Sequence, residues 1–180
     1  MDTSEPEINF DNLKAIFWEA NRAFLKNHAS LLKRELSERC LCGALMYELN
    51  KQLEKKDLKN YHADIEFNRD EGNVKRISYL TDDGVYLKRI FTDIIVHSRG
   101  EVSFDNLIAL EMKKSSASQE EIDDDKARLK QLTKQNTNTS FCSYGYILGI
   151  YYEINLDKEE IKIEFFYNGN REGQLFKCRY

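Results

Sequence analysis

The spacing of apolar residues changes near residue 60, and this change restricts the chain to folds that combine helices with a sheet. Before that point apolar residues recur at helical intervals, which predicts one helix over residues 10–26 and a second from about residue 30 to 56. Beyond it the periodicity is that of strands, and strands over 75–80 and 84–90 would form a hairpin around Asp83-Gly84. The other predicted strands cover residues 61–68, 92–97, 107–113, 144–154 and 161–168.

A third helix is predicted between the strands. Ser118 and Glu121 form the S-x-x-E pattern of a capping box, which opens a helix that extends to about Lys134. Acidic residues occupy the first half of this helix and basic residues the second, the arrangement that the helix dipole favours. Because 180 residues contain no linker, this order predicts one α/β domain, borderline α+β, with helices flanking a mixed central sheet.

The composition of the chain excludes several classes of protein. Hydrophobic residues make up 41% of the sequence, too many for a disordered chain, and no stretch reaches the roughly 18 apolar residues of a membrane span. The amino terminus lacks the basic and apolar regions of a signal peptide, so we expect a soluble, cytoplasmic protein. Buried, reduced thiols, and neither disulfides nor a zinc site, are expected of Cys40, Cys42, Cys142 and Cys178.

Charged residues stand at the ends of two strongly apolar strands. Asp93 lies at the head of TDIIVH, while Glu111 and Lys113 lie at the exit of LIALEMK, where residues two apart share one face. Buried charges are costly unless they are paired or bind a cation, and two carboxylates suit Mg²⁺. The lysine could orient or deprotonate an attacking water, or stabilise charge on a phosphate. The group suits metal-assisted phosphodiester hydrolysis, and the alternative is an ordinary salt bridge at the rim of the sheet.

A further acid is expected from the second helix. Glu38 precedes Leu41 and Leu45 at helical spacing, so it lies at the head of the stripe that packs on the sheet. Glu48 lies near the same face and is the rival candidate. Without a partner, either acid would cost stability on that face, and a metal site would supply the partner. The alternative interpretation of Glu38 is a solvated helix acid.

The order of these segments resembles the PD-(D/E)XK nuclease superfamily, whose fold includes the restriction endonucleases. Asp93 followed by Glu111-Met112-Lys113 matches the D…(D/E)-x-K signature of that superfamily. The resemblance is to a bacterial group of small stand-alone proteins and covers about residues 35–167. It is carried by the successive blocks DIEFNRD, TDIIVHSRG, NLIALEMKKSS, DKARLKQLT and YGYILGIYYEI.

The resemblance implies a role for each residue of the signature. Asp93 and Glu111 would hold Mg²⁺, for which Mn²⁺ could substitute, and the backbone carbonyl of Met112 would be a further ligand. Lys113 would be the catalytic lysine, and Glu38 would be the helix acid that many members carry. The chain departs from the superfamily name in having threonine where the name has proline, just before the aspartate.

The resemblance also implies how the chain is divided and what it binds. An N-terminal helical extension, residues 1–30, would precede a restriction-endonuclease-like domain, residues 31–180. Lys114, Lys126 and Lys130 would contact the phosphates of a nucleic acid. The alternative for the helix lysines is a solvated face that complements the helix dipole. A net charge of −4 argues against strong DNA binding by the chain as a whole, although a local basic patch can act within an acidic protein.

The sequence therefore predicts a Mg²⁺-dependent nuclease, either an endo- or an exonuclease, with DNA as its expected substrate and RNA as the alternative. The alternative is a catalytically silent module of the same fold that binds a protein partner. In that case an exposed Trp18 or Phe24 on the N-terminal helix would suit a homodimer or a partner surface.

Overall fold

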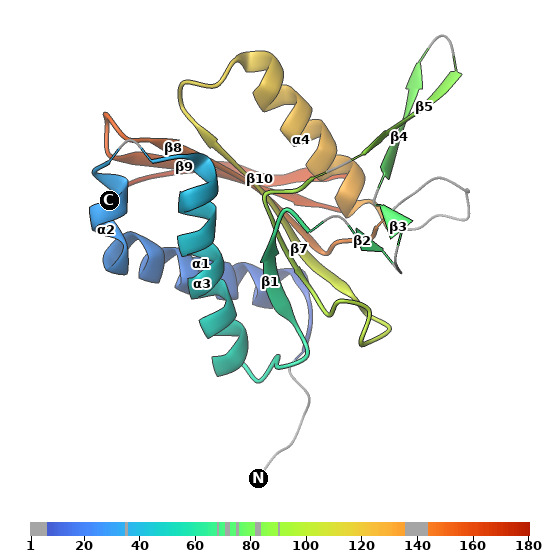
Figure 1. Cartoon of the computed structure of the whole chain (residues 1–180), viewed down its shortest axis with the longest axis horizontal. Coiled ribbons are helices and arrows are strands. Elements are labelled where there is room, and N and C mark those ends of the chain that lie inside the picture. Colours follow the sequence, from blue (N-terminus) through green and yellow to red (C-terminus); the bar gives the residue numbers. More distant parts are fainter. Residues whose placement is uncertain are drawn as a thin grey trace.

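A six-stranded mixed sheet forms the centre of the computed structural model (Figure 1). The structure describes residues 7–34, 36–67, 69–70, 73–74, 76–81, 84–89, 91–135 and 144–180. In the sheet, β7 and β8 are parallel and all other neighbours are antiparallel. The strands lie in the order β1 (His62–Ile65), β6 (Ile94–His97), β7 (Asn106–Lys114), β8 (Leu148–Asn155), β9 (Glu160–Tyr167) and β10 (Asn170–Arg179). The predicted mixed α/β class is confirmed.

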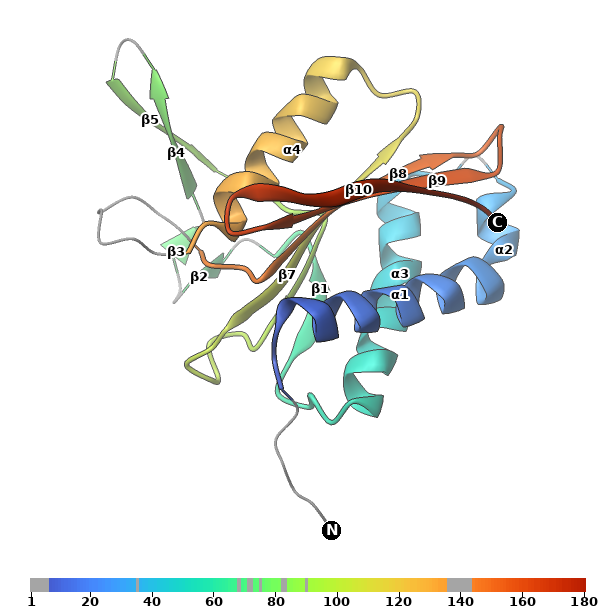
Figure 2. The same ribbon diagram turned by 180° about the vertical axis from the view of Figure 1, so that it is seen from behind.

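Helices cover both faces of this sheet. They are α1 (Phe10–Asn27), α2 (Ala29–Leu32), α3 (Glu38–Lys55) and α4 (Gln119–Thr133). In Figure 2, α1 and α3 lie on one face of the sheet and α4 lies on the other. Side chains alternate along β7, so Leu110 and Met112 join the larger apolar core beside α1 and α3, whereas Ala109 joins a smaller core with Leu129 of α4.

The predicted single helix over residues 30–56 is wrong, because the segment forms α2 and α3. Ser37 starts a new helix by accepting the backbone N–H of Cys40 with its hydroxyl. As a result α3 begins at Glu38, whose carboxylate lies in the first turn, where the helix dipole favours negative charge.

The apolar face of α1 is buried in the main core. The ring of Phe17 is fully buried and packs edge-on against the rings of Tyr152 and Phe165. Phe24 is also fully buried, so the expectation that it is exposed is wrong: the sheet covers the stripe of α1 on which it lies. Trp18 is partly buried against Phe165. A homodimer or partner interface through this helix stays a prediction, and it would have to use the outer face of the helix.

Two smaller pairings are described beside the main sheet. The predicted hairpin is confirmed as β4 (Arg76–Thr81) and β5 (Gly84–Arg89), which projects from the body of the molecule in Figure 1, while Asp83 of its turn lies outside the described residues. β2 (Arg69–Asp70) pairs with β3 (Asn73–Val74). The sequence pattern does not predict β10, because this edge strand is mostly exposed and has no apolar alternation.

The described helices and thiols carry two further findings. None of the helices in the described ranges combines the length and apolarity that crossing a membrane requires. Cys40, Cys42 and Cys178 are free thiols. Cys42 is buried, as expected, and burial raises its pKa, whereas Cys40 and Cys178 are exposed, so the expectation that they are buried is wrong. Cys142 lies outside the described residues.

Candidate functional site

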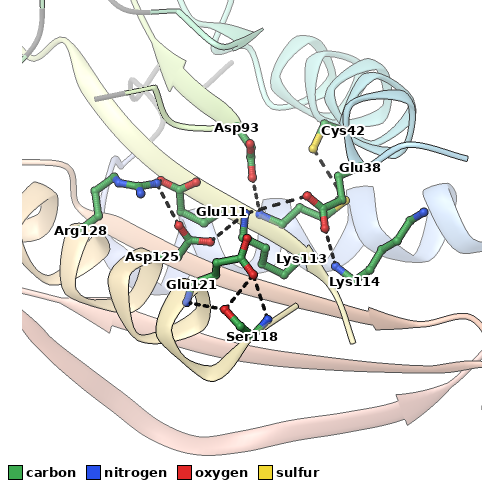
Figure 3. Close-up of polar contacts among 11 residues, drawn as sticks. Glu38, Cys42, Asp93, Glu111, Lys113, Lys114, Ser118, Glu121, Asp125 and Arg128 are labelled. Carbon is green, nitrogen blue, oxygen red and sulfur yellow. Dashed lines mark hydrogen bonds and ion pairs between the residues drawn. The ribbon is translucent and has the colours of Figure 1, made fainter. Parts of the chain in front are cut away.

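Charged side chains from α3, β7, α4 and the residue before β6 meet around the end of β7 (Figure 3). Glu111 and Lys113 project from β7 toward α4, as the alternation of a strand predicts. Met112 between them points to the opposite layer, where its Sδ lies 3.7 Å from Sγ of Cys42 in α3. The two charged residues of β7 thus share a face with the second turn of α4, away from the main core.

Asp93 joins this cluster from the residue before β6. Its Oδ2 accepts a hydrogen bond of 2.7 Å from the backbone N–H of Met112, which ties the start of β6 to the end of β7. Burial raises the pKa of Asp93; the Met112 hydrogen bond and the charge of Lys113 oppose this effect, and the charges of Asp125 and Glu38 add to it. The carboxylate is therefore held in place in surroundings that disfavour its charged form.

Glu38 joins the cluster from the first turn of α3, and Glu48 does not. Oε1 of Glu38 accepts the backbone N–H of Lys114 at 2.7 Å, and its Oε2 lies 3.9 Å from Nζ of Lys113. Glu48 is buried between α1 and α3, where its Oε1 lies 3.1 Å from Nε2 of His28. Of the two rival acids, Glu38 is the one that reaches the residues of β7.

Two members of the cluster, Asp125 and Arg128 of α4, were not expected from the sequence. Nη1 of Arg128 donates to Oε1 of Glu111 at 2.7 Å and lies 3.0 Å from Oδ1 of Asp125. Oδ2 of Asp125 lies 3.3 Å from Nζ of Lys113. Asp125 precedes the buried Leu129 by four residues, and this spacing places it on the sheet-facing side of the helix. That spacing was the available signal.

A glycine in β8 allows α4 to approach the sheet closely. A Cβ atom on Gly149 would lie 2.9 Å from Cγ2 of Thr133 in α4 and 3.0 Å from Cβ of Phe166 in β9. Both distances are shorter than the optimal separation of carbon atoms, roughly 3.5–4.0 Å. A side chain here would push α4, with Asp125 and Arg128, away from β7.

Glu111 and Asp125 are held where ionisation is unfavourable. Burial raises the pKa of Glu111 well above its usual range; the Arg128 guanidinium opposes this effect, while the charges of Asp93 and Asp125 add to it. Burial also raises the pKa of Asp125, against the attraction of Arg128 and Lys113. If all are ionised, four carboxylates face two cationic side chains, which leaves two excess negative charges. One divalent cation would balance them.

Lys113 is held in its protonated form. Burial lowers its pKa, but the carboxylates of Asp125, Glu38 and Asp93 outweigh burial, so the pKa of Lys113 is raised. An ammonium group donates hydrogen bonds and carries positive charge, but it cannot accept a proton from water. The surroundings of Lys113 thus favour charge stabilisation over general-base chemistry.

The structure does not bring all the basic residues expected at the site into the cluster. Nζ of Lys126 lies 2.6 Å from Oε1 of Glu164 in β9 and 4.7 Å from the ring centroid of Tyr151. Lys130 is exposed on α4. Lys114 contributes its backbone N–H, while its side chain extends away from the cluster in Figure 3. Contact of these lysines with phosphates stays a prediction.

One carboxylate oxygen of Asp93 and one of Glu111 remain available to a cation. Oδ2 of Asp93 and Oε1 of Glu111 are hydrogen-bonded, whereas neither Asp93 Oδ1 nor Glu111 Oε2 has a partner within the part of the chain that the structure describes. In the same ranges, no three His, Cys, Asp or Glu side chains are placed to hold a metal ion. Mg²⁺ takes one or two protein carboxylates and leaves its other positions to water and phosphate oxygens. The residues therefore fit such an open site and not a closed cage of side chains.

Comparisons of the chain with protein-family models, with curated proteins and with solved structures found no match. The resemblance to the PD-(D/E)XK superfamily therefore stays a prediction that depends on the sequence blocks.

Proposed function

We propose that the chain is a Mg²⁺-dependent nuclease of the PD-(D/E)XK type with a restriction-endonuclease-like fold. The observation that supports this proposal most is the meeting of Asp93, Glu111 and Lys113 at the end of β7, with Glu38 reaching them from the opposite helical layer. A mixed sheet flanked by helices on both faces agrees with the architecture that the resemblance implies.

The residues divide the chemistry between them. Asp93 and Glu111 would hold Mg²⁺ through their unbonded oxygens, with the Met112 carbonyl as a further ligand and Mn²⁺ as a substitute metal. When bound, the ion would polarise the phosphoryl group and acidify a coordinated water. Lys113, as an ammonium group, would stabilise the negative charge that develops on the phosphate. Glu38 would position Lys113 and anchor the end of β7.

DNA is the proposed substrate, in preference to RNA. Lys114 and Lys130 would contact the phosphate backbone, since Lys126 is engaged by Glu164. Exposed free thiols at Cys40 and Cys178 suit the reducing conditions of the cytoplasm, which is where we place the activity.

The test is incubation of the purified protein with plasmid, single-stranded DNA and RNA, in Mg²⁺ or Mn²⁺. Lys113→Met is expected to lower kcat by at least about 100-fold, the usual effect of losing one donor to a developing anion. The matched variant Lys114→Met, one residue later, is expected to change KM and to leave kcat near the wild-type value. If Lys113→Met cuts at the wild-type rate, the activity belongs to a contaminant or to another site.

The two helix acids provide a second test. Glu38→Gln keeps an oxygen for the Lys114 N–H but removes the charge beside Lys113, so cleavage should fall by about 10–100-fold with little change in stability. Glu48→Gln should leave cleavage unchanged and lower the free energy of unfolding by about 1–3 kcal/mol, because it weakens buried contacts to Asn27 and His28. Urea unfolding and cleavage assays measure both, and the reverse pattern would make Glu48 the site acid.

A catalytically silent module that binds a protein partner is the second candidate. The contact between Arg128 and Glu111 favours it, because a carboxylate neutralised by arginine has less need of a metal. Calorimetry distinguishes the two candidates, since the silent module would bind no divalent metal at neutral pH.

A further inference from the structure

Glu111 is neutralised by a cation of the protein itself. Its side chain is only 2% exposed, and its Oε1 accepts the 2.7 Å hydrogen bond from Arg128. An unpaired carboxylate so deeply buried would be strongly destabilising. Arg128 therefore supplies the positive charge that lets the cluster form when no metal is bound.

A second acceptor for Arg128 lies beside it on the same helix. Oδ1 of Asp125 is 3.0 Å from the same nitrogen, Nη1, that contacts Glu111. Oδ2 of Asp125 is buried and makes no hydrogen bond within the described ranges, although Nζ of Lys113 lies 3.3 Å away. Asp125 can thus hold Arg128 in the site when the contact with Glu111 weakens.

We propose that Arg128 is a resident counter-ion of Glu111 that competes with the divalent cation for this carboxylate, and that Asp125 retains Arg128 when the cation binds. The inference depends on the proposed function, because it assigns the regulation of the same metal site. It makes Arg128 a positioning residue whose side chain lowers the affinity of the site for Mg²⁺.

Electrostatics give the competition its direction. A guanidinium and a dication that share one carboxylate repel each other, and the surrounding low-dielectric protein strengthens that repulsion. Removing the charge of Arg128 should destabilise the metal-free protein and at the same time favour the metal-bound form. A residue with a merely structural role would lower stability with and without Mg²⁺ to the same extent.

The same helix offers a matched control in Lys126. Lys126→Gln removes one positive charge from α4 and breaks a contact to a largely buried carboxylate, that of Glu164. Arg128→Gln makes the same change at Glu111. A difference between the two variants therefore reports the contact with Glu111 and not the net charge of the helix.

The experiment is calorimetric titration of MgCl₂ into the metal-free full chain, with thermal unfolding in EDTA and in Mg²⁺. Arg128→Gln is expected to bind Mg²⁺ at least about tenfold more tightly than wild type, since close charge pairs couple by that much or more. Lys126→Gln should stay within about threefold of wild type. Arg128→Gln should also unfold at a lower Tm in EDTA and gain more from Mg²⁺ than either other protein.

The outcomes separate this inference from the proposed function. If the wild type binds Mg²⁺ and Arg128→Gln binds it no more tightly, Arg128 is no competitor, while the proposed function stands. If neither protein binds Mg²⁺, both are overturned. If Arg128→Gln fails to fold, the ¹⁵N resonance of Arg128 Nε is monitored while MgCl₂ is titrated into the wild type. A shift of this resonance on saturation supports the competition, and an unchanged resonance overturns it.

Discussion

Asp93→Asn is expected to reduce DNA cleavage by roughly 1000-fold, which corresponds to about 4 kcal/mol of lost transition-state stabilisation. The asparagine side chain retains an oxygen that can accept the N–H of Met112, so the join between β6 and β7 should persist. What disappears is the negative charge that would hold the metal. Single-turnover cleavage of plasmid in Mg²⁺ measures the loss, and Asp123→Asn, on the exposed side of α4, should cleave like wild type.

The same variant should be more stable than wild type at neutral pH. Burial raises the pKa of Asp93, so the folded protein binds this proton more tightly than the unfolded chain does. The stabilisation linked to that proton is present in acid and is lost as the pH rises through the raised pKa. The advantage of Asp93→Asn should therefore appear above this pKa and vanish below the ordinary value of 3.8. Urea unfolding midpoints of Asp93→Asn and wild type across that pH range test this expectation. A midpoint of Asp93→Asn below that of wild type at neutral pH would mean that the charged carboxylate stabilises the fold.

Phe17→Ala is expected to lower the free energy of unfolding by about 3–5 kcal/mol, because it opens a cavity between α1 and the sheet. Phe17 is fully buried and its ring contacts the rings of Tyr152 and Phe165. A loss of this size is a large part of the stability of an ordinary domain. Urea denaturation followed by tryptophan fluorescence and circular dichroism measures it.

Phe104→Ala is the control, since this phenylalanine is 50% exposed and its loss should cost less than about 1 kcal/mol. If both substitutions have equally small effects, α1 is a dispensable extension, as the predicted boundary at residue 30 implies. A large effect of Phe17→Ala alone would show that the sheet needs α1 as cover.

The elements that the sequence predicts well are those whose apolar pattern is complete within the element. β7 and α4 are examples, since one is an apolar strand and the other opens with a capping box at Ser118. The break between α2 and α3 is indicated only by Ser37, whereas the apolar spacing of the whole segment favours one continuous helix. β10 has no such signal, because an exposed edge strand is held by its backbone ladder to β9 and its side chains need no pattern.

Part of the candidate site could be predicted in the same way. Glu111 and Lys113 are recognisable because charges at the end of an apolar strand need a partner. The sequence interpretation did not use the spacing of Asp125 and Leu129, because the charges of α4 also fit the helix dipole. Which of them face Glu111 depends on how α4 is rotated and how closely it approaches β8, and Gly149 permits the close approach.

The contacts of Glu38 with Lys113 and Lys114 differ from the other contacts of the cluster in the length of chain they close. Glu111 and Arg128 are 17 residues apart and Asp93 and Met112 are 19 apart, whereas Glu38 and Lys114 are separated by 76 residues. Closing a longer loop costs more chain entropy. Most of the cluster thus comes from one contiguous stretch of the chain, residues 93–128. Glu38 joins it only when α3 has packed on the sheet. An incompletely folded chain would lack that acid.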